Sequence, residues 1–137
     1  VEMKVNYLAL YAIAASVFVL FDAIWLGVIA KKLYATELKG LMTNNVKWGA
    51  AALFYAIFIA GLIYFVIAPA LKADSSATIS LAGGFFGLVT YATYDLTNYA
   101  TLKGFPLKIV ILDLMWGTFV SGAVATISYM LYTKFVN

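Results

Sequence analysis

The chain contains no cysteine, no histidine and no arginine, and only two prolines among its 137 residues. Without cysteine it can form no disulfide and has no thiol nucleophile. Without histidine it lacks the commonest metal ligand and the base of a Ser-His pair. We therefore expect neither a cofactor-binding site nor a metal site.

Charge is also scarce: 11% of the residues are charged, against about a quarter in a soluble domain, and 65% are hydrophobic. All nine basic residues are lysines, spread over the loops rather than gathered into a stripe, so we expect no nucleic-acid partner. No lysine lies well inside a long apolar run, which excludes a retinal-type Schiff base. The composition indicates an integral membrane protein whose surroundings are the lipid bilayer.

Four apolar runs are each long enough to cross a bilayer, which takes about 20 helical residues. They cover residues 5–30, 47–71, 77–102 and 107–133. The sequence thus predicts an all-α membrane protein, an antiparallel four-transmembrane-helix bundle that forms one domain over residues 1–137. We expect the first run to be a retained helix, since it is longer than the apolar core of a signal peptide.

Lysines predict the orientation of these spans. Six of the nine fall in the loops after the first and third runs, and three fall at the N-terminus, in the second loop and at the C-terminus. The positive-inside rule then places loops 1 and 3 in the cytoplasm and both termini outside. Tyr7, Tyr129 and Tyr132 are expected in an aromatic belt at the outer interface.

The segment KKLYATELKGLMTNN after the first run has the spacing of a short amphipathic helix. Its apolar face consists of Tyr34, Leu38, Leu41 and Met42, and lysines and Glu37 take much of the rest. Such a helix either lies on the cytoplasmic membrane interface or packs on the bundle as a connector.

Asp22, Asp95 and Asp113 lie within predicted spans, five to nine residues from the lysines that mark the cytoplasmic ends. A charged aspartate at the centre of a bilayer costs at least about 2.5–3.5 kcal/mol. Each should therefore face the bundle interior, find hydrogen-bond donors or stay protonated. Asp95 shares one helical face with Gly84, Leu88, Tyr91 and Asn98.

Small residues recur on three of the predicted helices, and on the second run they are Ala52, Ala56 and Ala60. Gly83 and Gly87 form a small-xxx-small pair on the third run, and Gly117, Ser121 and Ala125 form a stripe on the fourth. Such stripes allow close contact between membrane helices. They also suit a homo-oligomer, a dimer or larger.

The first and last spans share an Asp-x-x-Trp pattern, in FDAIWLG and LDLMWGT. Because these helices run in opposite directions, counting from the lysines places Asp22 level with Trp116 and Asp113 level with Trp25. We predict a reciprocal clamp in which each indole N–H donates to the opposite carboxylate.

Several blocks of the chain resemble the DUF2177 family of small bacterial integral membrane proteins. They are FDAIWLGVIAKKLY, AALFYAIFIAGLIYFVIAPALK and GLVTYATYDLTNYATLKGFPLKIVILDLMWGT, which together cover most of the sequence. The resemblance implies the plasma (bacterial inner) membrane as location, but no activity. The matching positions are Asp22, Trp25, Gly27, Tyr94, Asp95, Thr97, Asn98, Lys103, Gly104, Pro106, Asp113, Trp116 and Gly117.

Three classes of function remain open. The polar cluster is suited to proton- or cation-linked transport or to binding of a small molecule, for which a hydrophobic or lipid-like molecule is a candidate. It is also suited to a membrane-embedded enzyme acting on a lipid or isoprenoid, with paired aspartates as acid and base. Alternatively, the acids only hold together the bundle of a structural or partner-stabilising subunit. The candidate binding residues are Asp22, Trp25, Tyr91, Tyr94, Asp95, Asn98, Asp113 and Trp116.

Overall fold

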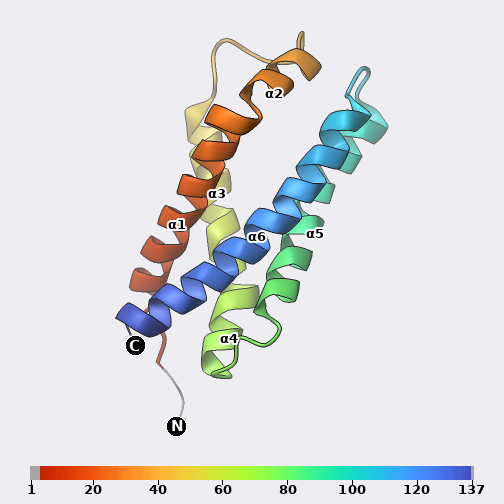
Figure 1. The fold of residues 1–137 in the computed structure, drawn as a ribbon. Coiled ribbons are helices and arrows are strands. Elements are labelled where there is room, and N and C mark those ends of the chain that lie inside the picture. Colours follow the sequence, from red (N-terminus) through yellow and green to blue (C-terminus); the bar gives the residue numbers. More distant parts are fainter. Residues whose placement is uncertain (1–3, 137) are drawn as a thin grey trace.

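The computed structural model describes residues 4–136, and all regular structure within them is helical (Figure 1). Helices α3 and α4 form one continuous segment, joined by a π-helical stretch, η2. A similar π-helical turn, η1, extends α1. In chain order the elements are α1 (Tyr7–Ile24), η1 (Trp25–Ile29), α2 (Lys31–Glu37), α3 (Trp48–Leu62), η2 (Ile63–Ile67), α4 (Ala68–Lys72), α5 (Ile79–Thr101) and α6 (Leu107–Phe135).

The four long helical segments begin and end within two residues of the four predicted runs. Three of them are long and apolar enough to cross a membrane: Tyr7–Ile29, Trp48–Lys72 and Leu107–Phe135. The fourth, α5, has 23 residues and at 1.5 Å per residue is about 34 Å long. It falls outside that class because its second half is rich in threonine, tyrosine, Asp95 and Asn98.

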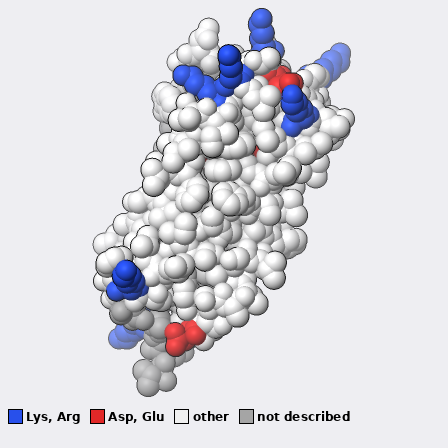
Figure 2. All heavy atoms as spheres, viewed as in Figure 1, with Lys and Arg blue, Asp and Glu red and all other residues white. Residues whose placement is uncertain are grey.

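Charged side chains gather at the two ends of the molecule, and an uncharged surface separates them (Figure 2). One end consists of α2, the start of α3 and the turn between α5 and α6, where six lysines lie. The opposite end holds Lys4, Lys72 and Lys134. We refer to the first of these as the lysine-rich end.

Helices α5 and α6 lie side by side (Figure 1) and pack against each other through glycines. A Cβ atom at Gly87 would lie 2.1 Å from the carbonyl oxygen of Gly117, and one at Gly83 would lie 3.0 Å from Cβ of Ala125. The backbones are therefore too close for larger residues at these positions. The predicted small-residue stripes meet each other within one chain.

A hydrophobic core fills the half of the bundle away from the lysine-rich end. Helix α1 contributes Leu10, Ala14 and Phe18, and α6 contributes Val120 and Val124, all with no exposed surface. The second half of α3 and η2 complete this core. The first ten residues of α3, in contrast, include none that is buried.

The π-helical stretches have local causes. Pro69 follows η2 and has no N–H to donate to the preceding turn, and a wider turn before it relieves the clash of its ring. At η1 the Ala30 N–H donates to the Trp25 carbonyl at 2.7 Å. This wider turn ends α1, and the chain changes direction there into α2.

Two details differ from the sequence predictions. Helix α2 ends at Glu37, before a turn in which Gly40 has a φ of 93°, so Leu41 and Met42 lie outside it and are exposed. The predicted belt is wrong for Tyr129 and Tyr132, which are buried, whereas Tyr7 is exposed. Tyr132 is buried because its hydroxyl accepts a hydrogen bond from the Asn6 N–H at 2.7 Å, and this contact joins α6 to the start of α1.

Candidate functional site

A layer of carboxyl and aromatic side chains lies between the hydrophobic core and the lysine-rich end. Its three aspartates come from three helices: Asp22 from α1, Asp95 from α5 and Asp113 from α6. Asp95 has no exposed surface and Asp22 is 8% exposed. All three face inward, as the cost of a carboxylate in lipid requires.

Asp113 is held by a chain of two hydrogen bonds. The Tyr34 hydroxyl donates to Oδ1 of Asp113 at 2.8 Å and accepts the indole N–H of Trp25 at 3.1 Å. Burial raises the pKa of Tyr34 above its ordinary value, so the phenol keeps the proton that it donates. Helix α2 is thereby bonded to both η1 and α6.

Asp22 has a different donor. The Tyr55 hydroxyl of α3 donates to its Oδ2. The indole N–H of Trp116 interacts with the same carboxyl group but does not meet hydrogen-bond geometry with any atom of residues 4–136. Asp22 therefore joins α1 to α3, with α6 alongside.

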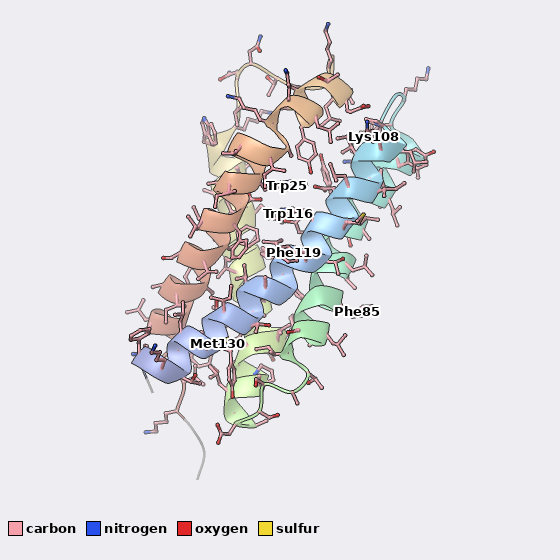
Figure 3. The ribbon with its side chains drawn as sticks, viewed as in Figure 1. Trp25, Phe85, Lys108, Trp116, Phe119 and Met130 are labelled. Carbon is pink, nitrogen blue, oxygen red and sulfur yellow. The ribbon has the colours of Figure 1, made fainter. Side chains whose placement is uncertain are left out.

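The two tryptophans stack on each other between α1 and α6 (Figure 3). The ring centroids of Trp25 and Trp116 are 4.4 Å apart, and the ring planes differ by 5°. The predicted clamp is wrong in its direct form, because Tyr34 intervenes between Trp25 and Asp113. The predicted levels are right: Trp116 lies by the carboxyl group of Asp22, and Trp25 is linked to Asp113 through the Tyr34 hydroxyl.

Asp95 is the exception among the three acids. Both of its carboxyl oxygens are buried, and neither has a hydrogen-bond donor among the described residues. The carboxyl group next to it is that of Asp113. Since two carboxylates are both acceptors, they can hydrogen-bond only if one is protonated, and otherwise they repel each other. The pair Asp95 and Asp113, called here the carboxyl pair, thus leaves acceptor atoms unused.

A cavity of about 330 Å³ is lined by Asp113 of the carboxyl pair, with Asp95 fully buried next to it. Its lining comes from three helices: Phe54 of α3, Tyr91 and Tyr94 of α5, and Asp113 of α6. Tyr91 is fixed by its contact with Gly117, where a Cβ atom would lie 2.2 Å from its ring. A glycine in α6 therefore makes room for one wall of the cavity.

A second cavity, of about 380 Å³, lies on the other side of α3. Asp22 and Tyr55 line it together with Trp48 and Gly27. Because these two polar groups bond to each other, their hydrogen-bonding needs are largely met without a ligand.

The candidate residues from the sequence come together in this layer, with one difference. Asn98 is half-buried and lies by the Tyr94 hydroxyl rather than being bonded to Asp95. Sequence reasoning missed two donors, Tyr34 and Tyr55. Tyr34 was on the predicted amphipathic face of loop 1, but Tyr55 lies in an apolar run with nothing to distinguish it.

The described part of the chain holds no group of three or more acidic, histidine or cysteine side chains placed to bind a metal ion. Below the layer, toward α4, the hydrophobic core closes the bundle with Phe18, Leu62 and Val120, none of which has exposed surface. The polar layer is thus a site on one side of a hydrophobic core.

No curated protein and no solved structure matches this chain. A family model described as a predicted membrane protein, DUF2177, matches residues 7–130. This match covers nearly all of the sequence, including the three aspartates and both stacked tryptophans. The chain belongs to the DUF2177 family of predicted membrane proteins.

Proposed function

We propose that this protein binds a proton or an organic cation at the carboxyl pair, as the site of a small-molecule binding or cation-linked transport function. The observation that carries the proposal is Asp95, whose two buried oxygens lack donors beside a second carboxyl group. A buried acceptor without a partner costs about 1–3 kcal/mol, and more when charged. A cation or shared proton between the two groups would remove both that cost and their repulsion.

The hydrogen bonds of the layer separate this role from a purely structural one. Asp22 and Asp113 each accept a tyrosine hydroxyl from another element, as an acid that holds helices together would. Asp95 makes no such bond within residues 4–136. A carboxyl group that costs stability and joins nothing is more readily explained by binding than by packing.

The proposal includes all four long helices as membrane spans. Helix α5 is less apolar than the others, yet its most polar group, Asp95, is fully buried. Its glycines pack directly on α6. A helix with inward-facing polar groups can cross the membrane at low cost, because lipid does not meet them. The closed core favours binding over an open conducting path in this conformation.

The test is difference infrared spectroscopy of the carboxyl stretch, on purified protein in nanodiscs. The wild type should show a protonated carboxyl band that diminishes as butylammonium chloride is added, because the ammonium ion replaces the shared proton, which is released to the buffer. Asp95→Asn should lack this response. The matched control is Asp74→Asn, the same change in a loop where Asp74 has a φ of 51°, a conformation that asparagine tolerates.

The control should respond as the wild type does, because Asp74 lies outside the layer. If the wild type shows neither a protonated band nor a butylammonium-dependent change, the proposal is wrong. It is equally wrong if the change persists in Asp95→Asn.

A further inference from the structure

One face of α5 leaves the bundle partway along the helix. Phe86, Thr90, Thr93 and Thr97 recur at intervals of four, three and four residues, so they lie on one face. At Phe86 this face packs on α3, with ring centroids 5.5 Å from Phe58. Thr93 and Thr97, nearer the lysine-rich end, are exposed.

Helix α3 is unpacked at the same level. Its first ten residues include none that is buried, and Phe54 and Ile57 are 48% and 63% exposed. The two helices therefore touch at Phe58 and Phe86 and separate toward the lysine-rich end. We call the space between their separated halves the wedge. The cavity beside the carboxyl pair opens into it, since Phe54 and Tyr94 line that cavity from its two sides.

The surface of the wedge is apolar in spite of the threonines. The Thr93 hydroxyl donates to the Val89 carbonyl at 2.7 Å, and the Thr97 hydroxyl donates to the carbonyl of Thr93. With their hydroxyls bonded to their own helix, these residues present methyl groups. The wedge thus has the character of an alkyl-chain site that ends at the carboxyl group of Asp113, with that of Asp95 buried next to it.

The end of the site that faces the loops is covered. Tyr34 of α2 lies over Asp113, to which it donates. Around it Leu33 and Leu38 pack on a small cluster from the start of α6 and the turn before it. An ion pair of 3.8 Å between Lys108 and Glu37 also joins α2 to α6. A solute from the aqueous side meets this cover, whereas the wedge is open along the sides of two long helices.

We infer that the ligand of the carboxyl pair is an amphiphile from the bilayer, with a protonated amine as head group and a single alkyl chain. This inference rests on the proposed cation site and names its ligand. The ammonium group supplies positive charge and three N–H donors to acceptors that lack them. The alkyl chain lies in the wedge between Phe54 of α3 and Thr97 of α5.

The size of the cavity agrees with this division of the ligand. A volume of about 330 Å³ holds about ten groups of the size of a water molecule, at about 30 Å³ each. That is enough for an amine head group and the first carbons of a chain. The remainder must extend through the wedge to the lipid, so a single chain fits the site.

The test is photo-crosslinking in nanodiscs with dodecylamine that carries a diazirine halfway along its chain. Labelled residues are identified by mass spectrometry, with unlabelled dodecylamine and butylamine as competitors. We expect saturable labelling of the wedge, at Phe54, Ile57 or Thr97. Dodecylamine should displace the probe at concentrations at least tenfold lower than butylamine does.

Two substitutions complete the design. Asp95→Asn should abolish saturable labelling, and Thr97→Phe, which fills the wedge while sparing the acids, should reduce it at least fivefold. Leu96→Phe is the matched control, because Leu96 is a neighbouring exposed residue on another face of α5; it should label as the wild type does.

The outcomes separate the two proposals. If butylamine competes as well as dodecylamine and the label lies outside the wedge, the amphiphile is wrong and the cation site stands. If labelling is not saturable, or is unchanged in Asp95→Asn and Thr97→Phe alike, both the amphiphile and its site at the carboxyl pair are wrong.

Discussion

Replacing Gly87 by alanine tests the closest contact in the fold. A Cβ atom there would lie 2.1 Å from the carbonyl oxygen of Gly117 and 2.4 Å from Oγ of Ser121, whereas an ordinary contact begins at 3.4 Å. The oxygen belongs to the α6 backbone and cannot rotate away. Helices α5 and α6 must therefore separate by about 1.3 Å at this level, the difference between these distances.

The substitution should destabilise the fold in two ways, because the added methyl group overlaps the α6 backbone and because the separated helices lose neighbouring van der Waals contacts. Overpacking of a close-packed interior costs about 1–3 kcal/mol, and a gap of this size forfeits much of the dispersion energy along the interface. We expect Gly87→Ala to lower the free energy of unfolding by about 2–3 kcal/mol. Tyr91 should also move, because its ring rests on Gly117 in the same interface.

The assay is reversible unfolding by titration of detergent micelles with sodium dodecyl sulfate, followed by near-ultraviolet circular dichroism. Gly49→Ala is the control: it is an exposed helical glycine whose added Cβ would meet no described atom within 4 Å. It should be neutral or up to about 1 kcal/mol more stable, as glycine-to-alanine changes in helices are. If Gly87→Ala unfolds within about 0.5 kcal/mol of the wild type, the close α5–α6 packing is refuted.

Two further predictions concern the aromatic residues. Tyr34→Phe should lower the free energy of unfolding by about 1.5–3 kcal/mol at neutral pH, the range for a hydrogen bond to a charged group. Because burial raises the pKa of Tyr34, this contribution should be full below the ordinary value of about 10 and decline above it. Unfolding titrations of the wild type should therefore lose stability at high pH more steeply than those of the variant, and equal slopes would contradict the burial of Tyr34. Trp25→Phe and Trp116→Phe should each remove the same coupled tryptophan signal from the circular dichroism spectrum, since the centroids of the two stacked rings are 4.4 Å apart. Two independent, additive losses of signal would show that the stack does not form.

The helices and the levels of their polar groups could be predicted from the sequence. Runs of apolar residues between lysines set the four long segments, and a fixed rise per residue converts sequence distance into depth. Counting in this way correctly placed Trp116 near Asp22 and Trp25 near Asp113. The small-residue stripes likewise predicted close helix contact, and the structure pairs Gly87 with Gly117 in that manner.

Which group serves as partner to which could not be predicted in the same way. Tyr34 lies between Trp25 and Asp113 because the chain bends after the π-helical turn so that α2 packs on the start of α6, and this is a property of the turn rather than of any spacing. Tyr55 reaches Asp22 because α3 packs beside α1. A tyrosine in an apolar run carries no signal of the carboxylate that it will meet.

The sequence by itself determined where the helices lie, which polar residues fall within apolar runs and at what level along its helix each one lies, because these properties depend on residues close together in the chain. The tertiary structure decided that Asp95 has no donor, that the tryptophans stack and that α3 and α5 separate into a wedge. Those features depend on the rotation and tilt of each helix. Both are set by contacts between residues far apart in sequence, such as Gly61 against the ring of Phe86.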